Sequence, residues 1–168
     1  MRQDGGKWKQ LTGWSTVEGQ WLRRKHFTPE VLAQIADRIK KSELDHTGEL
    51  VVAIEAVSPA HEPDSRCRAL EVFGRLRVWD TPLNTGVLLY LALDRHRIEI
   101  VSDRAIAATD EMWEQVCINL RTRLRNKDYA PGILAAIDDI EVILRTRCPP
   151  LTQGYINTND LPNDPTLL

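Results

Sequence analysis

The feature that most constrains the fold is an unbroken apolar run, Gly86–Leu93, followed after three polar residues by a shorter alternating segment, Arg97–Asp103. A run of eight residues is far shorter than the roughly 20 that a membrane-spanning helix needs. Its lack of alternation is typical of a strand that is buried on both faces. The short connection Asp94-Arg95-His96 predicts that the two segments form an antiparallel hairpin.

The rest of the chain predicts one more strand and four helices. Glu49–Val57 is rich in Val and Ile and predicts a strand that ends before Pro59. Apolar residues at helical spacing predict helices over residues 28–44, 65–78, 110–126 and 131–147. Because a helix joins the first two strands, we expect them to be parallel. The predicted fold is α/β: an α/β/α sandwich with a small mixed sheet of at least three strands, flanked by about four helices.

The two ends of the chain differ from this central domain, predicted over 28–148. The segment 1–27 contains more basic than acidic residues, and it includes three tryptophans, Trp8, Trp14 and Trp21. Their glycines disfavour a helix, so we expect an extended arm anchored by its tryptophans. Residues 149–168 are rich in Pro, Asn, Asp and Thr, so we expect a tail that lies over the domain or is mobile.

Composition indicates an ordinary globular protein. A chain of 168 residues with net charge -2 and 27% charged residues is neither disordered nor suited to coat nucleic acid. The first twenty residues lack the apolar stretch of a secretory signal, so we expect a cytoplasmic protein. Cys67, Cys117 and Cys148 are odd in number and widely spaced, which disfavours a disulfide framework or a zinc site. We expect buried free thiols.

Polar side chains gather where the predicted hairpin opens. With the turn around Arg95 and His96, Asp103 should face Leu88, next to the loop that precedes the apolar strand. The candidate ion or phosphate site at this rim consists of Asp80, Thr81, Asn84, Asp103 and Arg104.

Two chemistries fit this rim, and a structural interpretation competes with both. Asp80 and Asp103 with neighbouring amide and hydroxyl oxygens suit Ca²⁺ or Mg²⁺. The same carboxylates beside Arg104 could bind and protonate a phosphate ester. Alternatively, Asp80 and Asn84 only shape a proline-containing loop, and Asp103 caps a turn or pairs with Arg104.

Other motifs indicate little chemistry. There is no glycine-rich dinucleotide or nucleotide-binding loop, and none of the four histidines stands in a recognisable nucleophile motif. One basic run is predicted to be a solvated helix face rather than a phosphate-binding strip: Arg121, Arg123, Arg125 and Lys127. The absence of a catalytic constellation favours a binding or accessory role.

Several local strings resemble the TPM domain family, over roughly residues 26–168. The matching strings are His46-Thr47-Gly48-Glu49, Arg68-Ala69-Leu70-Glu71-Val72-Phe73, Arg77-Val78-Trp79-Asp80, Asn84-Thr85-Gly86-Val87-Leu88, Arg97-Ile98-Glu99-Ile100-Val101, Asp103-Arg104 and Trp113. Short bacterial members without a membrane anchor are especially similar. The resemblance implies an α/β/α sandwich, and relatives have been linked to acid phosphatase activity, calcium binding and the assembly or repair of membrane complexes. Two positions depart from the family pattern: Thr85 replaces a usual asparagine, and Ala105 replaces a glycine, which disfavours a family-type ion or phosphate site.

Three functions are therefore carried forward. The first is a non-enzymatic binding or accessory module with a protein partner. The second is a metal-assisted phosphatase that uses Asp80, Asn84, Asp103 and Arg104. The third is peripheral attachment to anionic membranes through the basic arm, in which each basic residue contributes about 1 kcal/mol.

Overall fold

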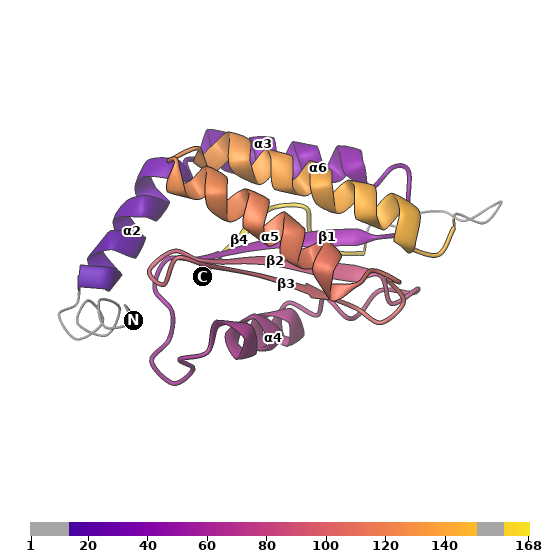
Figure 1. The fold of residues 1–168 in the computed structure, drawn as a ribbon, viewed down its shortest axis with the longest axis horizontal. Helices are drawn as coiled ribbons and strands as arrows, with labels where there is room; N and C mark the ends of the chain where they lie inside the picture. The colour runs from indigo at the N-terminus through magenta and orange to yellow at the C-terminus, as the bar shows by residue number, and fades with distance from the viewer. Residues whose placement is uncertain (1–13, 151–159) are drawn as a thin grey trace.

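The computed structural model describes residues 14–150 and 160–168, and these build a four-stranded sheet with helices on both faces (Figure 1). The strands lie in the order β3-β2-β1-β4, and their bounds are β1 Glu49–Glu55, β2 Gly86–Ala92, β3 Arg97–Ser102 and β4 Thr166–Leu167. β1 runs parallel to β2 and to β4, while β2 and β3 form an antiparallel hairpin. The prediction of a mixed sheet is confirmed, and β4 is an addition to it.

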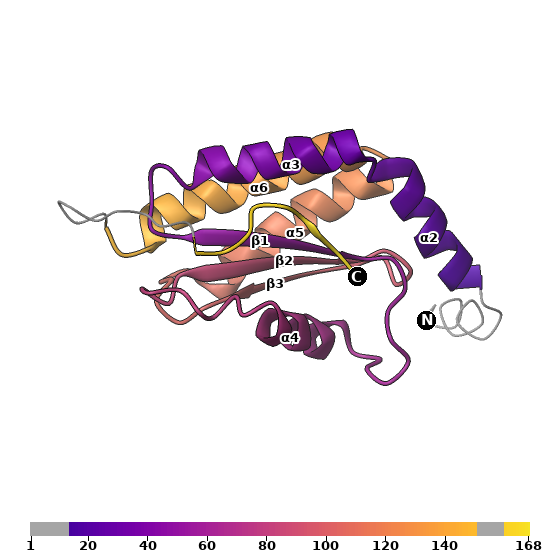
Figure 2. The same cartoon turned by 180° about the vertical axis from the view of Figure 1, so that it is seen from behind.

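The helices form a layer on each face of the sheet. On one face lie α3 (Pro29–Ser42), α5 (Asp110–Arg125) and α6 (Tyr129–Arg147), and on the other lies α4 (Ser65–Arg75) (Figures 1 and 2). Successive strand residues point to opposite faces, so Val52 and Ile54 pack under the three-helix layer while Val51 and Ala53 pack against α4. The predicted α/β/α sandwich is confirmed.

Local capping explains where two of these helices begin. Thr28 accepts a hydrogen bond from the Val31 amide at 3.5 Å, and Pro29 occupies the first helical position of α3. Asp64 accepts a hydrogen bond from the Cys67 amide at 2.9 Å and caps α4 in the same way. Both caps are short-range, which is why the starts of these helices could be predicted from sequence.

The extended arm predicted near the N-terminus is wrong for residues 14–26, which form the helix α2 (Trp14–His26). Gly19 explains the error, because a Cβ added there would lie 1.8 Å from the Ala56 carbonyl oxygen. The glycine that disfavours a helix locally is what lets this helix approach the end of β1. Burial of Leu22 and Phe27 in the core then outweighs the local propensity. Residues 1–13, including Trp8, lie outside the described residues.

The described part of the tail packs on the domain. Leu161 is buried, and the Leu168 amide donates to the Ile54 carbonyl oxygen at 2.9 Å, which attaches β4 to the edge of the sheet. Residues 160–168 therefore lie over the domain, which is one of the two alternatives expected from the sequence. Residues 151–159 lie outside the described residues.

The hairpin forms as predicted, but its register differs by two residues. Val101, not Asp103, faces Leu88, and the Asp103 amide donates to the Gly86 carbonyl oxygen at 2.9 Å. The cause is the turn, which lies one residue earlier than predicted and includes His96 with a φ of 51°. Because the register differs by an even number of residues, the side chains of β2 and β3 that share a face of the sheet are the same in both registers.

The cysteines are not uniformly buried. Cys67 is exposed on α4, so the expectation of a buried thiol is wrong there. Cys117 and Cys148 are half-buried, and burial raises the pKa of each thiol to about 11. All three thiols are free.

Candidate functional site

The open end of the β2–β3 hairpin brings Asn84, Asp103 and Arg104 together, and we call these three residues the rim. Asn84 has a φ of 55°, and its carbonyl oxygen accepts the Ala105 amide at 3.2 Å. Its side-chain oxygen accepts a hydrogen bond from Arg104 Nη2 at 3.2 Å. Two loops that are distant in sequence are thereby joined.

Asp103 is the chemically distinctive residue of the rim. Its Oδ1 accepts the Arg104 amide at 2.7 Å. Its Oδ2 is buried and has no hydrogen-bond partner in the described part of the chain. A buried oxygen without a donor costs roughly 1–3 kcal/mol, so the rim holds an acceptor that a ligand could satisfy.

The other two predicted site residues have contacts within their own loop. Asp80 accepts a hydrogen bond from the exposed Arg77 guanidinium. The Thr81 hydroxyl is buried and accepts the Thr85 amide at 2.9 Å. Asp80 and Asp103, the two predicted metal ligands, thus engage different partners. Within residues 14–150 and 160–168, no three His, Cys, Asp or Glu side chains gather as metal ligands.

Behind the rim lie buried polar groups at the start of β1. The Thr85 hydroxyl donates to the Thr47 carbonyl oxygen at 2.6 Å. Glu43 accepts the Leu50 amide at 3.0 Å, and burial raises the pKa of Glu43 to about 7 despite that bond. Glu49 accepts the Leu161 amide at 2.7 Å, and burial raises its pKa as well. These enclosed carboxyls hold β1 to the chain around it.

His46 belongs to the same buried region. Its Nδ1 accepts the Gly48 amide at 3.1 Å, and burial lowers its pKa. Its Nε2 is buried and has no hydrogen-bond partner among the residues that the structure describes. The neutral ring therefore fits this position better than the charged one.

A second buried polar group lies under α4, and sequence reasoning did not find it. Arg68 donates to Glu55 from Nε at 3.1 Å and from Nη2 at 2.7 Å, and the Tyr90 hydroxyl donates to the same carboxylate. Arg68 also contacts Glu71 at 2.8 Å. The hydrogen bond to Glu55 raises the pKa of Arg68, and burial raises that of Tyr90. Each charge has a partner, so we interpret this cluster as the attachment of α4 to the sheet.

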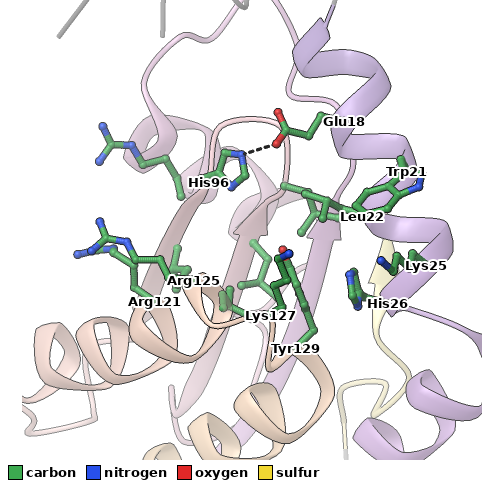
Figure 3. A pocket seen from close by; sticks show the side chains of 15 residues that line it. Glu18, Trp21, Leu22, Lys25, His26, His96, Arg121, Arg125, Lys127 and Tyr129 are labelled. Carbon is green, nitrogen blue, oxygen red and sulfur yellow. Dashed lines mark ion pairs between the residues drawn. The ribbon is translucent and has the colours of Figure 1, made fainter. Parts of the chain in front are cut away.

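A cavity of about 490 Å³ lies at the opposite end of the hairpin, between α2, the β2–β3 turn and the connection from α5 to α6 (Figure 3). Leu22, Leu91, Leu93 and Ile98 form a buried apolar floor. Five basic side chains also line it: Lys25, Arg97, Arg121, Arg125 and Lys127. We call this feature the basic cavity.

Sequence reasoning missed the basic cavity for two reasons. α2, which forms one wall, was predicted to be extended. The run from Arg121 to Lys127 is predicted to be a solvated face, and Arg123, Arg125 and Lys127 are exposed, but this prediction does not show that Arg121, Arg125 and Lys127 also line a cavity. Arg123 pairs with Asp128 at 2.9 Å. The signal available in the sequence was the presence of two basic segments, Arg95–Arg97 and Arg121–Lys127. Residue type alone does not show that these two segments meet in the folded protein.

Among residues 14–150 and 160–168, no helix combines the length and the apolar character needed to cross a membrane.

A model of the TPM domain family matches residues 23–143, which include all of the sheet except β4 and most of the helical layers. The chain therefore belongs to the TPM domain family. No curated protein matches the sequence.

Two solved structures share the fold. The NMR structure of the BA42 protein from the psychrophilic bacterium Bizionia argentinensis superposes with a TM-score of 0.72 at 25% identity, over 83% of this chain and 94% of that one. The solution NMR structure of the N-terminal domain of the cg2496 protein from Corynebacterium glutamicum superposes with a TM-score of 0.53 at 12% identity, over 77% of this chain and 82% of that one. The second likeness concerns the fold alone.

Proposed function

We propose that this TPM domain is a binding module rather than a hydrolase, and that its ligand contacts the rim. The buried, unpartnered Oδ2 of Asp103 carries this proposal. In a folded protein nearly all buried polar atoms have a partner, so Asp103 Oδ2 is an acceptor that can take a hydrogen bond from a bound ligand. A partner that supplies an N–H or O–H group would satisfy it.

The neighbouring charge narrows the chemistry of that partner. Arg104 is exposed, and its guanidinium lies 3.2 Å from Asn84 Oδ1. A protonated phosphate group matches both features, because its O–H can donate to Asp103 while its anionic oxygens accept from Arg104. A divalent cation is less favoured at this rim, since the guanidinium would repel it and Asp80 is engaged by Arg77.

Thermal melting with and without ligand tests the proposal. A ligand that prefers the folded state raises stability by about 2.7 kcal/mol at a concentration 100 times its Kd. We expect inorganic phosphate to raise the melting temperature of the wild-type protein and to leave that of Asp103→Asn unchanged. Asp80→Asn is the matched control and should respond like the wild type.

The same experiment can contradict the proposal. A phosphate response that survives in Asp103→Asn would remove the rim from consideration. A response to Ca²⁺ or Mg²⁺ that requires both Asp80 and Asp103 would favour the metal site predicted from sequence.

A metal-assisted phosphatase is the second candidate, because Asp103 and Arg104 beside Asn84 are also groups that a phosphate ester would contact. This candidate predicts turnover of a phosphate ester in the presence of Mg²⁺ or Ca²⁺, lost in the Asp80→Asn/Asp103→Asn double variant. Binding of phosphate without turnover by the wild-type protein would favour the binding module.

A further inference from the structure

We propose that the basic cavity binds a small amphiphilic anion, which is a flat apolar body that carries one negatively charged head group. This site lies at the turn end of the β2–β3 hairpin, whereas the rim lies at its open end. Seven residues of β2 separate the two, which is about 20 Å of strand. The inference is therefore independent of the function proposed above.

The interior of the basic cavity is suited to an apolar body. Its floor residues Leu22, Leu91, Leu93 and Ile98 are each at most 6% exposed. The volume of about 490 Å³ falls within the range of roughly 300–1,000 Å³ that small-molecule sites occupy.

One wall of the basic cavity is aromatic. The His26 ring stacks on Tyr129 with 3.9 Å between ring centroids and an angle of 16° between planes. Trp21 meets His26 edge-on at 6.2 Å and is 53% exposed, so it is accessible at the mouth (Figure 3). Flat, stacked rings that the fold already positions favour a flat apolar ligand, since little order is lost on binding.

The charges around the opening favour a negatively charged head group. Among the described lining residues there are five basic side chains and one carboxylate, which belongs to Glu18. The Oε1 atom of Glu18 lies 3.3 Å from His96 Nε2. Within the described residues, none of Arg97, Arg121, Arg125 and Lys127 forms an ion pair. Glu99, outside the cavity, interacts with Arg97 and Arg121 over a longer range.

This concentration of positive charge contrasts with the chain as a whole, whose net charge is -2. Like charges that converge on a cavity repel one another, and an anion between them lowers that cost. Arg121 and Arg125 approach from α5, across the opening from Trp21 and Lys25 on α2 (Figure 3). An anion at the mouth could therefore be contacted from both sides.

The remaining segments of this chain are poor occupants on grounds of charge. Residues 1–13 contain Arg2, Lys7 and Lys9 against Asp4, and residues 151–159 contain no Asp, Glu, Lys or Arg. Neither segment supplies an acidic cluster that would complement the cavity. The charge complementarity therefore points to a separate small molecule.

Binding of 2-naphthoate, followed by amide chemical shifts of the full chain, tests the inference. We expect saturable shifts at residues of α2, the β2–β3 turn and the end of α5. The neutral isostere 2-naphthamide should bind at least tenfold more weakly, because it lacks the charge that the basic side chains recognise. Acetate, which has the charge without the body, should produce no saturable shifts at the same concentrations.

Two variants of equal charge locate the interaction. Arg125→Gln/Lys127→Gln removes two exposed charges from the cavity and should weaken binding of 2-naphthoate about tenfold. Lys40→Gln/Arg75→Gln removes two exposed charges elsewhere and should leave the affinity within twofold of the wild type. Unchanged melting temperatures would show that both variants are folded.

Three results would overturn the inference. These are equal affinity for 2-naphthoate and 2-naphthamide, equal losses in the two double variants, or shifts confined to residues outside the cavity. Asp103→Asn should bind 2-naphthoate like the wild type, because Asp103 lies at the rim and not in the basic cavity. The two proposals can therefore fail independently of each other.

Discussion

The two ends of the β2–β3 hairpin use polar side chains in opposite ways. At the open end, Thr81 accepts the Thr85 amide, Thr85 donates to Thr47, and Arg104 donates to Asn84. At the turn end, five basic side chains line a cavity, and four of them, Arg97, Arg121, Arg125 and Lys127, form no ion pair in the described residues. The polar side chains at the open end therefore have hydrogen-bond partners within the protein, whereas most basic side chains at the turn end have no ion-pair partner among the described residues.

This difference shows that a cluster of ligand-type side chains in sequence does not by itself define a site. Loop residues such as Thr81 offer good ligand atoms, but the backbone amides that the loop must bury use them first. Lysines and arginines at a helix end are commonly solvated, and here Arg125 and Lys127 stay exposed while they also line a cavity that has α2 as one wall. What remains unsatisfied after folding is the better guide to binding, and Asp103 Oδ2 is the one such atom at the rim among the described residues.

The largest effect is expected at the open end, where close packing leaves no space beside Gly86. A Cβ added there would lie 1.9 Å from the Val78 carbonyl oxygen, which is backbone and cannot easily move. Gly86→Ala should lower the free energy of unfolding by about 4 kcal/mol, measured by urea denaturation. Gly74→Ala is the control, because no atom lies within 4 Å of the added Cβ and α4 should gain roughly 0.5–1 kcal/mol. Equal stability of the two variants would contradict the tight packing at this end.

A smaller effect is expected from the buried carboxyl behind the rim. The pKa of Glu43 is about 7 in the folded protein and 4.5 as its ordinary value. Because the folded-state pKa is raised, the contribution of Glu43 to stability is fully present below pH 4.5 and is lost as the pH rises through 7. Between pH 4.5 and 8, the wild type should therefore lose about 3 kcal/mol relative to Glu43→Gln, measured by urea denaturation at each pH.

Two features make this comparison specific. A glutamine at position 43 can still accept the Leu50 amide, so the hydrogen bond is retained. His46, whose lowered pKa acts in the opposite direction with pH, is present in both proteins and cancels in the difference. Glu114→Gln, at an exposed position of α5, reports what an ordinary loss of charge does. A difference that does not change with pH would contradict a buried, late-ionising Glu43.

The smallest effect on stability is expected at the turn end, from a substitution at Gly19 of α2. A Cβ at Gly19 would lie 1.8 Å from the Ala56 carbonyl oxygen, so Gly19→Ala should shift α2 away from the sheet. Alanine favours the helix, which offsets part of the cost, and we expect a net loss of about 1 kcal/mol. Affinity for 2-naphthoate should nevertheless fall about tenfold, because one wall of the cavity is displaced. Gln20→Ala, at an exposed position of the same helix, should leave both quantities unchanged. A stable Gly19→Ala variant that retains the affinity would show that α2 is not a wall of the binding site.

Most elements of the fold could be predicted because their signals are local. Thr28-Pro29 marks the start of α3, and the apolar runs of β1 and β2 mark a sheet that is covered on both faces. The errors occur where a distant contact decides. His96 in the turn has a positive φ, which the neighbouring residues do not indicate, so the observed register differs from the predicted one by two residues. β4 contains only two residues and exists because β1 offers an edge to pair with.

The candidate site divides in the same way. Sequence reasoning selected Asn84, Asp103 and Arg104, which the structure brings together, because a hairpin necessarily joins the loops at its open end. It also selected Asp80 and Thr81, whose atoms are used by Arg77 and Thr85. Which side-chain atoms remain available to a ligand depends on hydrogen bonds that form only in the folded loops. Residue type alone does not predict these hydrogen bonds.

By itself, the sequence determined that this chain buries a central hairpin between helical layers, because the periods of apolar residues dictate which faces must leave water. The tertiary structure alone decided that Gly19 packs α2 against the sheet, and that Lys25, Arg97 and Arg125 surround one cavity. Periodicity is a property of neighbouring residues, whereas the convergence of charges depends on where separate elements meet in space.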